Sequence, residues 1–125
     1  MVQTDISQLN AECSEWRQVL RNYRNEFNQS QKDLQSLCRS HLSKDQLLEV
    51  EHLSNQFHIQ LINIHDLKKE IKQHTQQLEY EQSGKEGISE DTINRHEKLY
   101  DAFSHMEMTL LDLRTEFQNF SQQVA

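Results

Sequence analysis

Three side chains that could bind a metal fall at core-facing positions of three separate amphipathic segments. They are one thiol and two imidazoles, Cys13, His74 and His96. Cysteine and histidine are ligands that Zn²⁺ prefers, and three protein ligands leave the fourth tetrahedral position open or filled by water. If the segments pack antiparallel with short connections, all three residues fall in nearly the same layer. The alternative is a metal-free polar layer near one end, in which the histidines bond to each other and to water.

Glu49 and His52 form a Glu-x-x-His pattern, the unit that di-iron helical bundles use twice. The pattern occurs once here, and heptad phase places both residues beside the core-facing row and outside it. No glutamate on another helix is expected to point inward. We interpret this pair as coincidental.

Six basic side chains are expected to gather at one level of the first two segments. A cluster of this kind could bind an acidic partner segment or a phosphate. The alternative is a solvated surface that nearby acidic residues neutralise through exposed ion pairs, each contributing only about 0–1 kcal/mol. The cluster consists of Arg17, Arg21, Arg24, Lys68, Lys69 and Lys72.

Five large apolar residues fall outside the core-facing rows of the second and third segments. Antiparallel pairing places residues 59–62 opposite about 108–111, which predicts an apolar belt at mid-length. Clustered surface hydrophobic residues usually mark a contact, and a central belt suits a two-fold dimer. The alternative is a rotation of the second helix that buries the belt internally. The belt consists of Leu48, Ile59, Ile62, Met108 and Leu111.

These placements depend on heptad spacing in three long stretches. Apolar residues recur at alternating intervals of three and four, which is typical of amphipathic helices and not of strands. With two glycines and no proline among 125 residues, the chain lacks the turns of a sandwich or barrel and the glycine-rich junctions of a doubly wound sheet. The spacing predicts helices over about 5–41, 44–82 and 90–124, in one domain covering 1–125.

The connections between these helices carry their own signals. Ser43 and Gln46 fit a capping box at the start of the second helix. Gly84 or Gly87 can take the left-handed conformation that ends this helix, and Ser89 can cap the third. Because short connections force neighbouring helices to lie antiparallel, we expect an all-α, up-down-up antiparallel three-helix bundle.

In outline the chain resembles a spectrin-type repeat, which is also an antiparallel three-helix bundle with a tryptophan in its first helix. The resemblance rests on Trp16 and on the heptads. It implies an architecture, and no function follows from it.

Composition excludes several classes of partner. Twenty acidic against thirteen basic residues give a net charge of −7, which argues against a nucleic acid as the main partner. No apolar run approaches the roughly 20 residues of a membrane helix, and no secretory leader is visible, so the expected location is the cytoplasm. Cys13 and Cys38 would lie about 37 Å apart on one helix, which predicts free thiols.

No nucleophile lies in a recognisable catalytic elbow, and a narrow bundle lacks the concave cavity that a small-molecule substrate requires. We therefore expect no enzymatic activity. The sequence favours a protein–protein association module that forms a homodimer through the belt or docks a partner helix there. The alternatives are a metal-binding or sensing bundle, for which zinc would be the only cofactor, and an anion-binding adaptor that uses the basic cluster.

Overall fold

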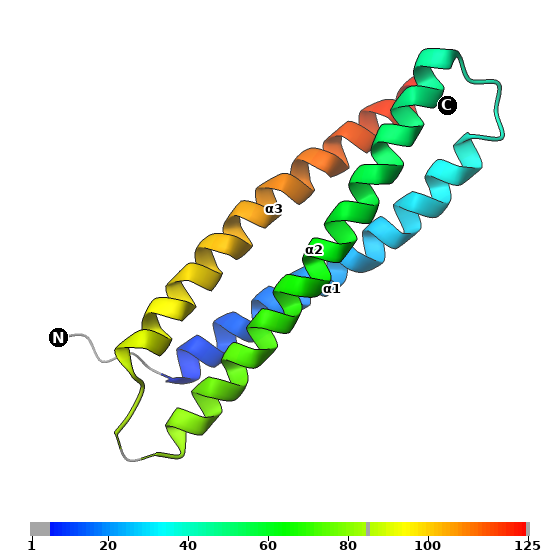
Figure 1. Ribbon diagram of the computed structural model, residues 1–125. Coiled ribbons are helices and arrows are strands. Elements are labelled where there is room, and N and C mark those ends of the chain that lie inside the picture. The colour runs from blue at the N-terminus through cyan, green and yellow to red at the C-terminus, as the bar shows by residue number, and fades with distance from the viewer. Residues whose placement is uncertain (1–5, 85, 125) are drawn as a thin grey trace.

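Three long helices make up most of this protein. The computed structural model describes residues 6–84 and 86–124, and its helices are α1 (Ile6–Leu37), α2 (Lys44–Gln82) and α3 (Glu90–Val124). Figure 1 shows α2 returning alongside α1 and α3 running back along α2, and each pair of helices is in contact. The predicted all-α, up-down-up bundle is confirmed. Among the described residues, no helix contains an apolar stretch long enough to cross a membrane.

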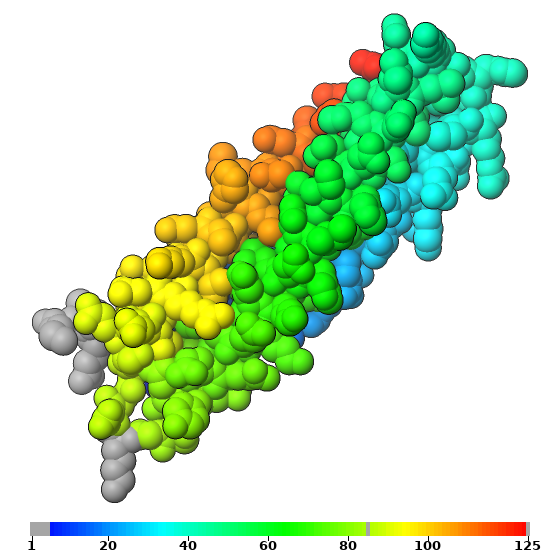
Figure 2. Space-filling view, viewed as in Figure 1, coloured from blue at the N-terminus to red at the C-terminus, as the bar shows by residue number. Residues whose placement is uncertain are grey.

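The core is one continuous row of side chains from each helix. Along the length of the bundle each helix buries one face against the other two. The molecule is an elongated body (Figure 2). The fully buried side chains are Cys13, Leu20, Phe27, Leu34, Leu53, Phe57, Ile64, Ile71, His74, Leu78 and Leu110. This burial stabilises the three helices, because an isolated helix gains little stability from propensity alone.

An aromatic cluster lies in the half of the core nearer the connection between α1 and α2. Phe27 of α1 and Phe57 of α2 meet edge to face with ring centroids 5.1 Å apart, and Phe57 meets Phe117 of α3 at 5.3 Å. Edge-to-face pairs at these separations add to the free energy of burial because positive ring edges meet negative ring faces. One residue from each helix is therefore fixed at this level.

The first connection contains the predicted capping box. The Ser43 N–H donates to Oε1 of Gln46 at 2.8 Å, and the Gln46 N–H donates to the Ser43 hydroxyl at 3.1 Å. Two backbone donors at the start of α2 are thus satisfied by side chains, and the predicted start of this helix is confirmed.

The prediction that the first helix extends to about 41 is wrong, because α1 ends at Leu37. The Ser40 N–H donates to the Leu37 carbonyl at 3.1 Å, which closes a tight turn in place of another helical turn. His41 is exposed, and the next side chain packed against the core is Leu42. Extending the helix would bury no further apolar side chain. The predicted start at residue 5 lies outside the described residues.

The second connection uses the glycine and the cap that the sequence singles out. Gly87 has φ of 78°, a left-handed conformation that a side chain would strain. The Thr92 N–H donates to the Ser89 hydroxyl at 3.2 Å, so Ser89 caps α3 as predicted.

Glu81 ties this connection to both helices, which the sequence did not predict. Its carboxylate accepts hydrogen bonds from the Ser89 N–H at 2.6 Å, from the Thr92 hydroxyl and from the Gln77 amide at 2.7 Å. Burial opposes ionisation of Glu81, but these hydrogen bonds outweigh it and lower the pKa of the carboxyl to about 2. The end of α2 is thereby fixed to the start of α3.

Candidate functional site

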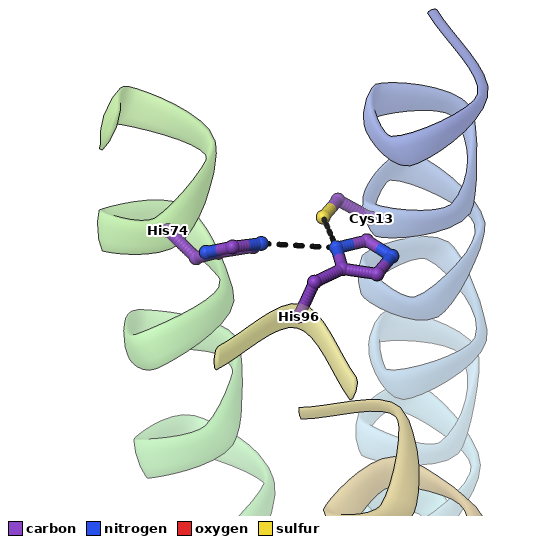
Figure 3. A group of neighbouring side chains, drawn as sticks. All are labelled: Cys13, His74 and His96. Atoms are coloured by element: carbon purple, nitrogen blue, oxygen red, sulfur yellow. Dashed lines mark hydrogen bonds between the residues drawn. The ribbon is translucent and has the colours of Figure 1, made fainter. Parts of the chain in front are cut away.

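The structure brings Cys13 of α1, His74 of α2 and His96 of α3 together in the core (Figure 3). Nε2 of His74 lies 2.9 Å from Nδ1 of His96, and Sγ of Cys13 lies 3.9 Å from the same nitrogen. One ligand atom from each residue lies within 4.8 Å of the other two. The side chains are buried, with only 1%, 0% and 5% of their surfaces exposed. The predicted shared layer is confirmed.

Glu12 extends this group toward the surface. Its Oε2 lies 2.9 Å from Nε2 of His96, and its side chain is 34% exposed. A carboxylate only accepts hydrogen bonds, so Nε2 of His96 carries the proton and Nδ1 presents its lone pair to His74 and Cys13. The sequence did not predict this contact of Glu12. Its position next to Cys13, flanking the core-facing row, is the signal that could have identified it.

The hydrogen-bond chain leaves one buried nitrogen without a partner. Because Nδ1 of His96 accepts, Nε2 of His74 must donate to it, and Nδ1 of His74 is then unprotonated. This Nδ1 is buried and has no hydrogen-bond partner within the part of the chain that the structure describes. An unsatisfied buried polar atom costs about 1–3 kcal/mol, so the layer is less favourable than an apolar one of the same shape.

Aromatic rings cover the His96 side of the group. The Trp16 indole packs on His96 with ring centroids 4.8 Å apart, and Tyr100 and Phe103 lie 6.1 and 5.9 Å from the indole. A surface groove between α1 and α3 is lined by Trp16, Tyr100 and Glu12 among others. The group is therefore shielded by aromatic side chains and has Glu12 at its outer edge.

The buried environment keeps the ligand atoms neutral. Burial, followed by the charges of His96 and Arg95, lowers the pKa of His74 to about 4. Burial also raises the pKa of the Cys13 thiol, although a hydrogen bond with Thr75 opposes this. At neutral pH the layer holds a neutral imidazole in place of a cation, which leaves a nitrogen lone pair available as a metal ligand.

Glu49 and His52 are joined by Glu116 of α3, which the sequence did not predict. Nε2 of His52 lies 3.1 Å from Oε1 of Glu116, and the two side chains are 49% and 42% exposed. Burial, with the hydrogen bond and charge of Glu116, raises the pKa of Glu49. All three residues could reach one ion, but they lie on the surface, as heptad phase predicted. We therefore retain the interpretation that the Glu-x-x-His pattern of Glu49 and His52 is coincidental.

Four members of the predicted basic cluster lie near one another. Burial and then the charges of Arg24, Arg21 and Arg17 lower the pKa of Lys68. Lys69 and Lys72 are exposed on α2. The ion pairs within the described ranges join His52 to Glu116, His96 to Glu12 and Arg114 to Glu26, so none neutralises the cluster. The alternative in which nearby carboxylates pair with these cations is not supported.

The five residues of the predicted belt are exposed, at 42–66% of their surfaces. The alternative in which α2 rotates and buries them is therefore wrong. The residues in question are Leu48, Ile59, Ile62, Met108 and Leu111.

Heptad positions distribute these five residues over more than one face. His52 and Asp112 line the groove between α2 and α3, and Ile59 lies one heptad after His52. Ser104 lines the groove between α1 and α3, and Leu111 lies one heptad after Ser104. Residues seven apart share a helix face, so Ile59 borders the α2–α3 groove and Leu111 faces the α1 side.

Comparison with protein-family models, with curated proteins and with solved structures finds no match to this chain.

Proposed function

We propose that this bundle is a non-enzymatic protein–protein association module that pairs with a second copy of itself through α2 and α3. The distribution of exposed apolar side chains supports this proposal. Within the described residues, α2 exposes Leu47, Leu48, Ile59, Ile62 and Tyr80, α3 exposes Tyr100, Met108 and Leu111, and α1 exposes no large apolar residue. Scattered surface hydrophobic residues would fall on all three helices, whereas residues confined to two helices favour a contact made by those two helices.

The centre of the proposed surface is Ile59, Ile62 and Met108. Ile59 and Ile62 are one turn apart on α2, so they share a face. Gln60 and Thr109 line the same groove, which places Met108 at the level of these isoleucines on α3. Leu48 and Leu111 lie at the margins. Because this centre is near mid-length, a two-fold axis through it lays two copies side by side along their full length.

The size of the bundle is sufficient for such a pairing. A standard interface buries about 800 Å² per partner. That is roughly one tenth of the 8632 Å² surface of this chain, which one long face of the bundle can supply.

Sedimentation equilibrium of the wild type and of the double variant Ile59→Asp/Ile62→Asp tests this proposal. We expect a dimer for the wild type and a monomer for the variant, because a buried pair of carboxylates without partners opposes association. Tyr80→Asp is the matched control, since Tyr80 is exposed on the same helix but far from the centre. A monomeric wild type at millimolar concentration, or a dimeric double variant, would contradict self-association through this surface.

A second candidate function is binding of an acidic protein segment at the basic cluster. Lys68 and the three arginines near it have no carboxylate partner among the described residues and repel one another, and an acidic segment would relieve this repulsion. We expect a poly-glutamate peptide to bind at low ionic strength and to be lost in Arg21→Glu/Arg24→Glu. Arg39→Glu/Lys98→Glu, at two exposed positions outside the cluster, is the control of equal charge change. Equal binding by both variants would assign the interaction to net charge alone.

We place this module in a reducing compartment such as the cytoplasm. Cys13 and Cys38 are both free, Cys13 in the core and Cys38 on the surface. An exposed thiol persists where the environment keeps cysteines reduced. Labelling of the native chain with a thiol reagent should modify Cys38 far faster than Cys13.

A further inference from the structure

We propose that Cys13, His74 and His96 form a Zn²⁺ site that joins all three helices near the end of the bundle where α1 begins. Each helix contributes one ligand, and the three side chains point toward one another (Figure 3). This proposal is independent of the association proposed above, because it concerns the core of a single chain.

The distances between the ligand atoms suit a tetrahedral zinc ion. With Zn–N of about 2.0–2.1 Å and Zn–S of about 2.3 Å, two nitrogens lie about 3.4 Å apart and a nitrogen and a sulfur about 3.5 Å apart. The observed separations are 2.9 Å between the two nitrogens and 3.9 Å between Sγ and Nδ1 of His96. These two separations need to change by about 0.5 Å to meet the geometry of the ion. The ligand atoms of Cys13 and His74 lie within 4.8 Å of each other, so this third separation needs to shorten by up to about 1.3 Å.

Glu12 holds His96 in the form that a metal requires. Metal-binding histidines usually donate their other ring N–H to a carboxylate, which fixes the tautomer and the ring orientation. The hydrogen bond from Nε2 of His96 to Glu12 has this arrangement, and it directs the Nδ1 lone pair into the group. Glu12 is thus a positioning residue for the proposed site.

Zinc would replace the hydrogen bond between the two imidazoles. The proton on Nε2 of His74 moves to Nδ1, so that Nε2 can bind the ion through its lone pair. The Cys13 thiol loses its proton to solvent and binds as a thiolate, so one proton is released per ion bound. Three protein ligands leave the fourth position to a water molecule.

Zinc titration of the metal-stripped chain against a chromophoric chelator tests this site. We expect one Zn²⁺ per chain in the wild type, a higher melting temperature with zinc, and no stoichiometric binding in Cys13→Ser or His74→Gln. Cys38→Ser is the matched control, because Cys38 is the same residue type outside the group and exposed. It should bind one ion as the wild type does.

Two further measurements keep the test independent of folding defects in these variants. Co²⁺ added to the wild type should give a thiolate-to-cobalt charge-transfer band, which is absent if Cys13 is not a ligand. Glu12→Gln leaves all three ligands in place and should weaken zinc binding about 10–100-fold. Sub-stoichiometric binding by the wild type, or full binding by a folded His74→Gln, would overturn the proposal. Loss of zinc binding in His52→Gln would instead place the ion at the surface group of Glu49, His52 and Glu116. That result would also overturn the proposal.

Discussion

Two levels of the same core show how one packing pattern supports different chemistry. In the half of the bundle nearer the α1–α2 connection, Phe27, Phe57 and Phe117 meet through ring edges and faces, and these contacts involve no hydrogen bond. Toward the end where α1 begins, Cys13, His74 and His96 meet through directional contacts between polar atoms. Each level takes one residue from each helix. The packing of the bundle therefore determines which residues meet. The types of these residues determine whether the layer stabilises the fold or provides ligand atoms.

The largest expected effect comes from removing the ring at the centre of the aromatic level. Phe57→Ala leaves a cavity between two other rings and should lower the free energy of unfolding by about 3–5 kcal/mol. Urea denaturation followed by circular dichroism measures this change. Phe57→Leu, which keeps most of the volume, should cost clearly less. Equal losses for the two variants would show that the edge-to-face geometry, and not the filled volume, holds this level together.

The polar level should respond to pH where the aromatic level does not. The pKa of His74 is about 4 in the folded, metal-free chain and about 6.5 when unfolded, so the unfolded state binds more protons between these values. The unfolding free energy should therefore fall by about 2–3 kcal/mol as pH drops from 6.5 to 4, with no contribution from His74 above that window. Burial is the main cause, His96 and Arg95 add to it, and Glu81 opposes it.

Urea denaturation at a series of pH values checks this dependence. His74→Gln removes the titrating group and should flatten the curve between pH 4 and 6.5. His58→Gln, at an exposed position of the same helix, should leave the curve unchanged. A His74→Gln curve as steep as that of the wild type would assign the acid sensitivity to another group.

Most of the fold could be predicted from the sequence because each helix has an unbroken row of apolar residues and the connections are short. The same rows placed Cys13, His74 and His96 in one layer, since antiparallel helices with short connections fix the levels. Glu12 and Glu81 could not be predicted in this way. Both lie beside the core-facing rows, and their partners depend on side-chain rotamers that heptad spacing does not determine.

The end of α1 was misplaced for a related reason. Heptad spacing continues to His41, but a polar residue at a core-facing position gains nothing from burial. His74 and His96 are buried at such positions because each finds a hydrogen-bond partner across the core. His41 follows the last packed turn of α1 and is exposed.

A smaller effect should follow from weakening the connection next to the polar level. Glu81→Gln removes a charge that accepts hydrogen bonds from the Ser89 N–H and the Thr92 hydroxyl, and it should cost about 1–2 kcal/mol at pH 7. The pKa of Glu81 is about 2, below its ordinary 4.5, so this contribution is present above pH 4.5 and is lost as pH falls toward 2. Thermal melts check this dependence. The melting temperatures of the wild type and of Glu81→Gln should differ at pH 7 and become nearly equal at pH 2.5.

The smallest expected effect concerns the ion pair between Glu26 of α1 and Arg114 of α3. Two hydrogen bonds of 2.7 and 2.6 Å join these side chains, and the guanidinium lies 4.9 Å from the centre of the Tyr23 ring. Both side chains are about one third exposed, at 37% and 34%, so solvent screens much of the attraction. A double-mutant cycle with Glu26→Gln and Arg114→Gln should give a coupling free energy of about 0.5–1 kcal/mol that shrinks in 1 M salt. A coupling that persists undiminished in salt would show that stacking on Tyr23 and the shape of the pair, and not its charge, hold α1 against α3 between the two levels.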